Sequence, residues 1–477
     1  MPLILPGNVG SATAATGYDV DNSARFQTAS LKRSAGSKTN ATQATISMWF
    51  KRSDLVDCVL MQSYTDDNNR AYIKLLSNTF YFFDKSGGTN RNYWVSTFVL
   101  RDISAWYHLH INIDTGNGTA ANRFIVHLNG VNQPVANFTN NASYGSGVTS
   151  NWQQASGTNQ FTIGANESVN DQYFGGYMSE VVYLDGQVVA YDSFGEFDED
   201  SGIWKPIDVS GLTFGTNGFY LDFEDSANLG NDANGGTDLT EVNLAATDQS
   251  TDTCTNNFAT LNPLASGSFP VFSEGNINVR ANSDAEYGNV FSTLSTSSSG
   301  KWYYEIKVIG KTGTSPFLGM VVDDAPKAGI ATNGGANSAG GTSFSAPTFA
   351  FQSNGKVSQG GSEGSTYTSF AIGDIISFSI DMDNGACYIA KNGTYMNSGN
   401  PASAGSKTGA IITWTAGSVS GFLPSVSVYG ASTSSGSFSA VSMNFGSPSF
   451  AISSGNTDGN GYGNFEYAVP SGYYSLN

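Results

Sequence analysis

The sequence predicts an all-β protein built from antiparallel, jelly-roll-like β-sandwiches. Short runs of β-branched and aromatic residues recur between clusters of Asn, Gly, Ser and Asp, which is the pattern of strands and turns. Charged residues make up 13% of the chain, about half the roughly 25% of an average globular protein, while aromatic residues also reach 13%. No long amphipathic helix pattern occurs. The length of 477 residues indicates two or three domains.

The first strand-rich block spans residues 21–205, and its spacing of apolar runs and turns fits an antiparallel sandwich. Within residues 122–130, Phe124, Val126 and Leu128 share one side of a strand, so that side is expected to pack inward. Asn129 and Gly130 then favour a tight turn. The expected strands are ATISMWFKR, AYIKLLSNTFYFFD, WYHLHINID, NRFIVHLNG, FTIGA and GGYMSEVVYLDG.

Two further segments lack this pattern. Residues 1–20 are small, polar and aperiodic, which predicts an N-terminal arm that docks on a partner, with a disordered tail as the alternative. Residues 206–265 are rich in acids and turn residues, which predicts an acidic linker. Inside that linker, GFYLDF (residues 218–223) predicts one strand that completes an edge of the first sandwich.

Strands resume in residues 266–477, which predict a second sandwich. The alternation of Ile376, Phe378 and Ile380 indicates a half-buried strand, and the residues that follow favour a tight turn and a returning strand. The Gly- and Ser-rich segments 331–345 and 353–369 are predicted to be loops. The expected strands are KWYYEIKV, PFLGMVVDD, PTFAFQ, DIISFSIDMD, ACYIAKNG, LPSVSVYG and AVSMNFG.

The order of these strands carries two family resemblances. GKWYYEIKV, FLGMVVDD, IGDIISFSIDMDNGACYIAKNG, LPSVSVYG and VSMNFG resemble, in that order, the successive strands of a SPRY domain. This resemblance implies a bent sandwich that recognises proteins through its loops, and it brings no catalytic residue with it. The first block is similar to concanavalin A-like, laminin G-type sandwiches, a fold that sugar-binding lectins and glucan hydrolases share.

The combination of the two modules carries a third resemblance. Together with GTNGFYLDFEDSANLG, TNNFATLNP and the tail NTDGNGYGNFEYAVPSGYYSLN, it resembles virion proteins of marine tailed bacteriophages. That resemblance implies a fibre, a spike or a capsid decoration. The opening MPLILPGNVG lacks the basic region and apolar run of a signal peptide, which disfavours signal-led secretion and fits release by lysis. We therefore expect the protein on the surface of a virion.

Net charge limits the partners. The formal charge of -18 and pI near 4.4 predict repulsion from phosphate backbones and anionic membranes, so nucleic acid is not an expected partner. No apolar run is long enough to predict a membrane span. The three cysteines, Cys58, Cys254 and Cys387, are far apart and odd in number, which predicts buried core residues and no disulfide framework. Neutral glycans and cations stay open as ligands.

Catalysis finds little support in the sequence. Glycoside hydrolysis needs two carboxylates beside the scissile bond, and the related hydrolases place theirs as E-x-D-x-x-E on one strand. In GEFDEDSGIW, Glu196 and Asp198 match the first two places, but Ser201 stands at the third. His108 and His110 lie on one side of a predicted strand. They could bind a metal or transfer protons, and the alternative is that they are surface or core side chains. We therefore expect that the protein is not an enzyme and requires no cofactor.

A calcium ion is the one metal that the sequence suggests. The acidic loop DFEDSANLGNDANGG offers the oxygen ligands that calcium prefers, although turn-forming Asp and Asn residues give the same pattern. Its spacing does not match an EF-hand loop. The candidate calcium ligands are Asp222, Glu224, Asp225, Asn231 and Asp232.

Aromatic residues beside amide side chains in predicted loops are the candidates for ligand binding, because rings stack on sugar faces. In NRNYWV, Tyr93 and Trp94 lie next to Asn90 and Asn92, and Trp152 follows Asn151 in TSNWQQ. Packing in a core is the competing role for each of these rings.

The sequence therefore predicts a non-enzymatic virion protein that recognises a host-surface glycan or protein, as a tail fibre or host-attachment appendage. A capsid-surface fibre or decoration protein is one alternative, a polysaccharide depolymerase is another, and a secreted adhesin a third. The arm is expected to contact other virion proteins. Because avidity favours host binding, we expect a homo-oligomer, with a trimer favoured.

Overall fold

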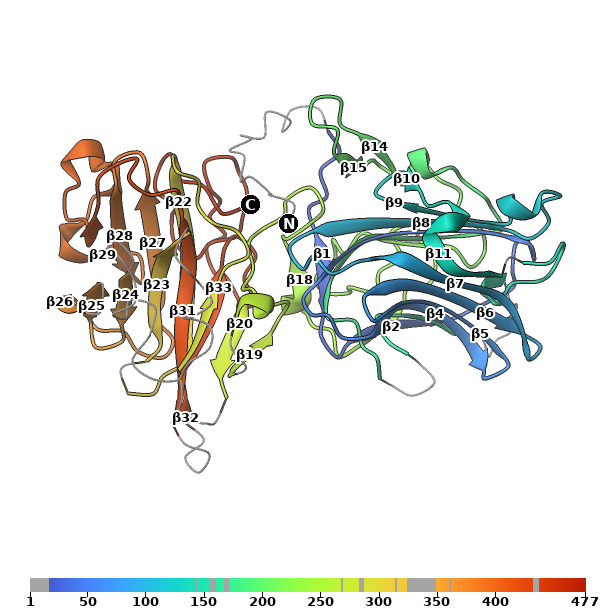
Figure 1. Cartoon of the computed structure of the whole chain (residues 1–477), viewed down its shortest axis with the longest axis horizontal. Helices are drawn as coiled ribbons and strands as arrows, with labels where there is room; N and C mark the ends of the chain where they lie inside the picture. Colours follow the sequence, from blue (N-terminus) through green and yellow to red (C-terminus); the bar gives the residue numbers. More distant parts are fainter. Residues whose placement is uncertain are drawn as a thin grey trace. The chain divides into compact units, whose positions relative to one another are not determined.

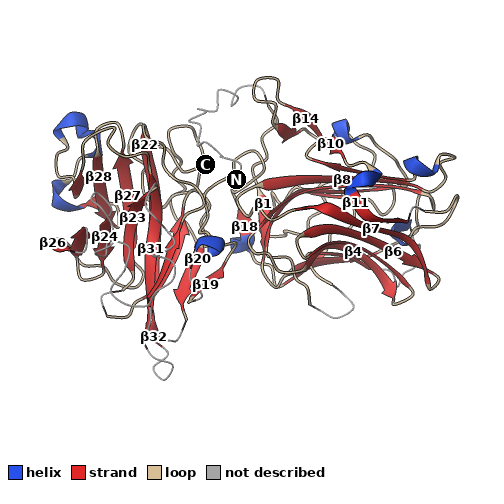
Figure 2. Cartoon of the chain, in the orientation of Figure 1, coloured by secondary structure: helices blue, strands red, loops and turns tan. Residues whose placement is uncertain are grey.

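The computed structural model describes residues 17–142, 144–153, 160–166, 171–266, 269–282, 287–313, 315–323, 349–359, 362–431 and 437–477. Most of the predicted arm, residues 1–16, and the predicted loop 331–345 lie outside these residues. Strands dominate the described chain and only short 3-10 helices occur (Figure 2), which confirms the predicted all-β class. No helix among the described residues is long and apolar enough to cross a membrane.

The chain forms two compact units. We call residues from Thr13 to Asn257 the first sandwich and residues from Phe258 to Asn477 the second sandwich. Each contains stacked antiparallel sheets (Figure 1). The 3-10 helices of the described chain are η1 (Ala120–Asn122), η2 (Val135–Asn137), η3 (Asn151–Gln153), η4 (Tyr191–Ser193), η5 (Ala246–Asp248), η6 (Pro263–Ala265), η8 (Met396–Ser398) and η9 (Pro401–Ser406).

The first sandwich has two main sheets and a small hairpin. In hydrogen-bonded order, sheet A contains β10 (Val131–Asn132), β9 (Phe124–Leu128), β8 (Trp106–Asp114), β3 (Gln43–Arg52), β13 (Gly176–Asp185), β1 (Ser23–Phe26) and β18 (Gln249–Ser250), with β16 (Phe219–Leu221) also pairing with β13. Sheet B contains β11 (Phe138–Ala142), β7 (Thr89–Val99), β6 (Thr79–Ser86), β5 (Asn69–Leu76), β4 (Cys58–Asp66), β12 (Gln160–Ile163), β2 (Ser30–Ser34) and β17 (Thr240–Val242). The hairpin pairs β14 (Gly195–Phe197) with β15 (Trp204–Pro206).

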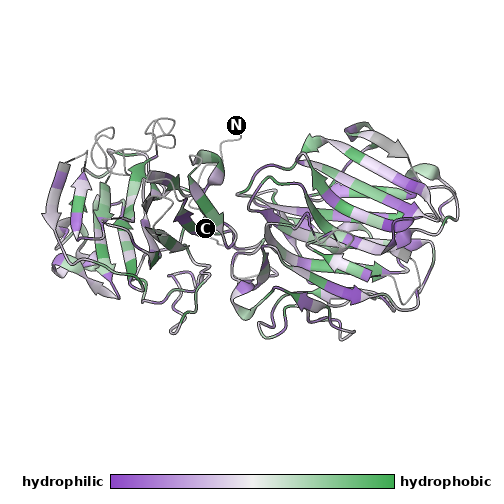
Figure 3. Ribbon diagram, turned by 90° about the horizontal axis from the view of Figure 1, so that it is seen from below, coloured by the Kyte–Doolittle hydropathy of each residue, from purple (hydrophilic) through white to green (hydrophobic). Residues whose placement is uncertain are grey.

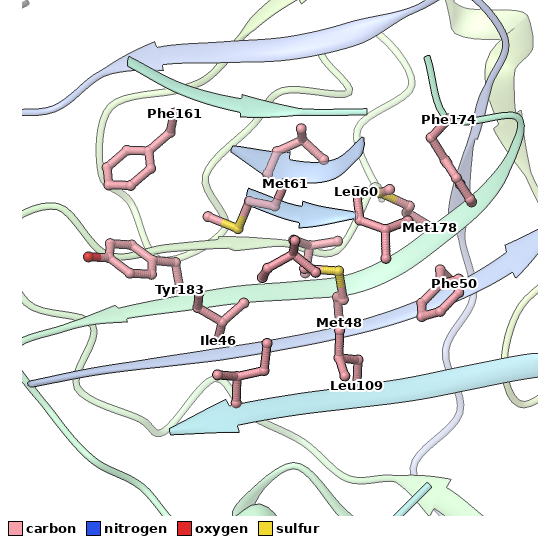
Figure 4. Close-up of a cluster of buried hydrophobic side chains, with 14 of the residues drawn as sticks. Ile46, Met48, Phe50, Leu60, Met61, Leu109, Phe161, Phe174, Met178 and Tyr183 are labelled. Carbon is pink, nitrogen blue, oxygen red and sulfur yellow. The ribbon is translucent and has the colours of Figure 1, made fainter. Parts of the chain in front are cut away.

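Local patterns account for several of these strands. Phe124 and Val126 are buried in the core, as their alternation predicted, and Asn129 and Gly130 both have positive φ in the turn that follows β9. The predicted run at residues 71–84 is a hairpin of β5 and β6. Side chains from both sheets meet in one core, part of which Figure 4 shows, with Met48 and Met178 of sheet A near Leu60 of sheet B.

The acidic segment after residue 205 contributes more strands than the sequence indicated. The predicted strand is β16, which pairs with β13 of sheet A. Two others were not predicted: β17 pairs with β2 of sheet B, and β18 pairs with β1 of sheet A. These strands are two or three residues long, too short for an alternating pattern. Up to Asn257, the segment is therefore part of the first sandwich.

The second sandwich also has two main sheets. One contains β19 (Pro270–Ser273), β20 (Asn278–Ala281), β33 (Ala440–Asn444), β22 (Lys301–Gly310), β27 (Ile375–Asp381), β28 (Ala386–Lys391) and β29 (Thr394–Tyr395), with β30 (Ile412–Thr413) on β28. The other contains β21 (Tyr287–Phe291), β31 (Phe422–Ala431), β23 (Phe317–Val322), β24 (Phe349–Gln352), β25 (Lys356–Gln359) and β26 (Ser362–Thr366), with β32 (Ser437–Phe438) on β31.

One expectation about the second sandwich was wrong. Residues 353–369 were predicted to be a loop, but they contain β25 and β26, which extend the sheet from β24. The reason is tertiary: the free edge of β24 supplies hydrogen-bond partners to a Gly- and Ser-rich segment that has little strand propensity of its own.

Candidate functional site

Three neighbouring strands of sheet B, β5, β6 and β7, carry aromatic and cationic side chains on the face that points away from the core. On β6 the alternation is complete, with every second residue from Thr79 half-buried and the others buried. The hydropathy bands along the strands of this sandwich follow such alternation (Figure 3). We call this set of outward side chains the aromatic–cation face. Its members are Arg70, Tyr72, Lys74, Tyr81, Phe83, Lys85, Arg91 and Tyr93.

Strand register brings the rings of this face together. Tyr72 lies opposite Phe83, and Phe83 lies opposite Tyr93, so one row of rings crosses three strands. Tyr72 and Phe83 stack with ring centroids 5.9 Å apart, and Tyr81 meets Tyr93 edge to face at 5.2 Å. These separations are typical of attractive aromatic pairs. Tyr81, Phe83 and Tyr93 keep part of their surface in solvent, whereas Tyr72 is 7% exposed.

Cations lie directly over these rings. The Lys74 Nζ atom is 4.7 Å from the ring centre of Tyr81 and 5.3 Å from that of Tyr72, and the Arg70 guanidinium carbon is 5.6 Å from the latter. Such cation–π contacts hold long side chains in place. Burial lowers the pKa of Lys74 and raises that of Tyr81, because each charged form loses solvent. The result is an ordered, partly dry platform.

An open platform of rings with charged groups beside them suits recognition. Ring faces and edges attract apolar C–H surfaces, while lysine and arginine donate hydrogen bonds to hydroxyl or acidic oxygens. The face can therefore bind a ligand through ring contacts and hydrogen bonds.

The predicted ligand-binding residues separate into two environments. Tyr93 belongs to the aromatic–cation face, but its neighbour Trp94 points into the core, where it is 3% exposed and packs against Phe124 at 4.9 Å and Phe138 at 4.6 Å. Trp152 is 1% exposed in the same core. Both tryptophans are thus structural, because neither ring reaches solvent.

The ring partners of Tyr93 were not predicted, and NRNYWV, which was expected in a loop, is part of β7. Tyr72, Tyr81 and Phe83 were treated as strand residues only. A signal was present, since RAYIK alternates cation, aromatic and cation on one side of a strand, and RNY repeats the first half. What the sequence lacked was the register that makes these strands neighbours.

The candidate calcium ligands lie around β16, and one of them has another role. The buried carboxylate of Asp232 pairs with Arg33 at 3.1 Å and accepts a hydrogen bond from the Tyr220 backbone N–H. Asp222 and Asp225 each accept a backbone N–H two residues ahead, which is the turn-forming use of Asp.

Two observations bear on the remaining calcium ligands. Burial raises the pKa of Asp222, and burial together with the charge of Asp222 raises that of Glu224. Asn231, which precedes Asp232 in the sequence, is half-buried. Within the described residues, no group of three or more His, Cys, Asp or Glu side chains is placed to hold a metal. Calcium stays a prediction.

The acidic loop that resembles a hydrolase motif is an ion-paired turn. Lys205 Nζ lies 3.3 Å from Glu196 and 3.4 Å from Asp198, and Asp198 also accepts hydrogen bonds from the backbone N–H and hydroxyl of Ser201. These donors lower the pKa of Asp198 to about 2. A general acid needs a raised pKa, so this carboxylate is poorly suited to that role.

The histidines form a buried hydrogen-bonded cluster on sheet A. Trp204 Nε1 donates to His108 Nδ1 at 2.9 Å, so His108 is neutral and its Nε2 donates to Ser47. His110 Nε2 donates to the Val189 carbonyl at 3.0 Å, which leaves Nδ1 to accept from His127. Burial lowers the pKa of all three histidines. Each imidazole is therefore hydrogen-bonded to another residue of the first sandwich.

A buried glutamate on β13 is the other notable carboxyl group. Glu180 is 4% exposed, occupies a positive φ at a bulge in the strand, and accepts hydrogen bonds from Tyr220 at 2.8 Å and Tyr18 at 3.3 Å. Burial raises its pKa to about 8. At neutral pH the group is therefore largely protonated.

Sequence families agree with the two sandwiches. Residues 22–189 match the concanavalin A-like lectin/glucanases superfamily, and residues 301–441 match the SPRY domain family. The chain therefore carries a concanavalin A-like, laminin G-type domain and a SPRY domain. No curated protein sequence matches the chain.

Several solved structures align with part of the chain at low sequence identity. The SPRY domain of human HERC1 aligns at 13% identity over 38% of this chain and 96% of its own, with a TM-score of 0.28. A candidate carbohydrate binding protein from Bacteroides ovatus aligns at 15% identity over 47% of this chain and 58% of its own, with a TM-score of 0.33. A SAP-like pentraxin from Limulus polyphemus aligns at 15% identity over 36% and 80%, with a TM-score of 0.24.

Proposed function

We propose that this protein is a non-enzymatic adhesion protein whose first sandwich binds a surface glycan through the aromatic–cation face. The row of rings that register assembles across β5, β6 and β7 carries this proposal. Buried rings stabilise a core, but Tyr81, Phe83 and Tyr93 lie on the outer side of the sheet and keep part of their surface in solvent. Partly exposed rings in fixed positions give affinity at little cost in side-chain entropy.

We place this adhesion protein on a bacteriophage particle, as a tail fibre or host-attachment appendage, with a capsid-surface fibre or decoration protein as the alternative location. The resemblance of the paired modules and the C-terminal tail to phage virion proteins supports this placement. The N-terminal arm would contact other virion proteins. A homo-oligomer, with a trimer favoured, would present several faces at once and raise the avidity for a repetitive polysaccharide.

Binding of the full-length protein to an array of bacterial surface polysaccharides tests the proposal. The variant Tyr81→Ala/Tyr93→Ala removes two edge-to-face rings and should lower binding at least tenfold, because stacked rings carry much of the contact energy. Its matched control is Tyr287→Ala/Tyr429→Ala, which removes two half-buried tyrosines, with ring centroids 4.6 Å apart, from the second sandwich.

The control separates the outcomes. Loss of binding in the first variant alone, with both variants folded by circular dichroism, supports the aromatic–cation face. Loss in the control alone would move recognition to the second sandwich, and no polysaccharide binding by the unaltered protein would overturn the proposal.

The depolymerase alternative has one observation in its favour, which is the raised pKa of Glu180. A glycosidase acid is protonated at neutral pH, and Asp222 and Glu224 are close enough to raise that pKa further. Against it, Glu180 is buried and both tyrosine hydroxyls occupy its carboxyl group. New reducing ends from host polysaccharide, lost in Glu180→Gln, would establish the depolymerase.

A further inference from the structure

We infer that the aromatic–cation face selects an acidic glycan, one that carries carboxylate or sulfate groups, over a neutral one. This inference rests on the proposed function and names its ligand class. The face gathers Arg70, Lys74, Lys85 and Arg91 on three neighbouring strands, although the whole chain has 21 lysines and arginines against 39 acids. Such a gathering of cations in a chain of net charge -18 requires an explanation.

The cations occupy regular positions relative to the rings. Along β5, Arg70 and Lys74 lie two residues before and after Tyr72, so all three point outward. On β6, Lys85 follows Phe83 by two residues and pairs across the sheet with Arg70. Positive charge thus borders the row of rings on both sides.

Arg91 completes the border on β7. It precedes Tyr93 by two residues, at an irregularity in the pairing of β6 with β7, and its Nε donates to the Ser86 carbonyl at 3.2 Å. That hydrogen bond uses one donor of the guanidinium group. The remaining nitrogens can donate side by side to two oxygens of one acidic group.

Most of this charge is not neutralised within the face. Arg70 pairs with Asp67 at 2.7 Å, but among the described residues Lys74, Lys85 and Arg91 form no ion pair. Carboxylates lie near each of these three cations without pairing with them: Asp57 and Asp171 near Lys74, Asp66 near Lys85, and Asp84 near Arg91. Because none of these carboxylates forms an ion pair with them, the three cations can still pair with acidic groups of a ligand.

Contacts with rings and cations together distinguish acidic glycans from other anions. Rings attract the C–H faces of sugars, while fixed cations favour carboxylate or sulfate groups between them. The repulsion that the net charge exerts at long range is screened beyond about 8 Å at physiological ionic strength, so charges in direct contact decide selectivity.

A matched pair of polysaccharides tests the inference: an acidic polysaccharide and the same polymer after chemical reduction of its carboxyl groups or removal of its sulfates. We expect the full-length protein to bind the acidic form at least tenfold more tightly. The variant Lys74→Gln/Lys85→Gln should lose that preference, measured as the ratio of its affinities for the two polymers. Its control, Lys205→Gln/Lys356→Gln, makes the same change in net charge on β15 and β25 and should keep the preference.

The outcomes separate the two claims. Equal binding of both polymers, or an unchanged preference in Lys74→Gln/Lys85→Gln, overturns the acidic-glycan inference and leaves the proposed function standing. If the control variant Lys205→Gln/Lys356→Gln also lost the preference, the preference would depend on the overall charge of the protein, and the inference would be overturned. No binding to either polymer, or to any other polysaccharide, overturns the proposed function and the inference with it.

Discussion

Glu305 and Tyr467 are 162 residues apart, yet the backbone N–H of Tyr467 donates a hydrogen bond to Glu305 Oε1 at 2.9 Å. The same buried carboxylate accepts the Glu466 N–H at 3.0 Å, the Asn444 amide at 3.1 Å and the Tyr303 hydroxyl at 2.9 Å. One side chain of β22 thereby satisfies two backbone donors of the C-terminal tail. The tail is thus part of the second sandwich.

Replacing Glu305 should destabilise the second sandwich. Glu305→Ala leaves several buried donors without partners, and each unsatisfied donor costs about 1–3 kcal/mol, so we expect a loss of about 3 kcal/mol or more. Glu305→Gln keeps the shape and one acceptor oxygen, and should cost less. Denaturant unfolding measures both, and hydrogen exchange at Glu466 and Tyr467 should accelerate in the alanine variant. Unchanged exchange there would show that the carboxylate does not hold the tail.

Acid should weaken the first sandwich through His110. Burial lowers its folded-state pKa to about 3, below the ordinary value of 6.5. A depressed pKa means that the unfolded chain binds the proton more tightly, so this contribution to stability is complete above pH 6.5 and is lost as the pH falls toward 3. The stability advantage of the unaltered protein over His110→Gln should shrink by roughly 1.4 kcal/mol per pH unit below pH 6. A constant difference between pH 7 and pH 4 would contradict this.

Glu180 should make the first sandwich less stable as the pH rises, the opposite of the effect of His110. Its folded-state pKa of about 8 exceeds the ordinary value of 4.5, so folding favours the protonated form. The contribution is complete below pH 4.5 and is lost as the pH rises through 8. Glu180→Gln mimics the protonated carboxyl, and should gain stability relative to the unaltered protein between pH 5 and pH 8. Thermal unfolding of both proteins across this range tests the prediction. If the advantage of Glu180→Gln grew as the pH fell, the pKa of Glu180 would not be raised.

Substitutions of Tyr93 and Trp94, which are adjacent on β7, should affect glycan binding and stability differently. Trp94→Phe removes ring volume from the core, which should outweigh the gain from removing a buried indole N–H that has no hydrogen-bond partner, so we expect a stability loss of about 1–3 kcal/mol and unchanged glycan binding. Tyr93→Ala should weaken glycan binding with a smaller change in stability. Isothermal titration and denaturant unfolding of the two single variants distinguish these effects. Weaker glycan binding by Trp94→Phe would show that Trp94 contributes to ligand binding.

The predicted calcium ion has a direct test. Burial and the neighbouring carboxylates raise the pKa values of Asp222 and Glu224, and a cation among Asp222, Glu224 and Asp225 would oppose both effects. A chelator should then lower the midpoint of thermal unfolding, and Asp225→Asn should reduce that effect. An unchanged midpoint in the unaltered protein would remove the ion.

Local patterns predicted what depends on neighbouring residues in the sequence. The inward side of β9, the tight turn at Asn129 and Gly130, and the alternation of β27 follow from side-chain periodicity and from the turn preferences of Asn and Gly. In contrast, β17 and β18 have too few residues for a pattern, and distant strands supply their hydrogen bonds. Similarly, β25 and β26 depend on the edge of β24.

The candidate face shows the same division. The sequence by itself determined an all-β chain with two strand-rich blocks, but it predicted a loop for the segment that holds Tyr93 and Trp94, which the structure places on β7. Only the tertiary structure decided which side is the core, because that depends on the strands that pack against β7. It also decided that Tyr72, Phe83 and Tyr93 form one row, because strand register is set by hydrogen bonds between segments rather than within them.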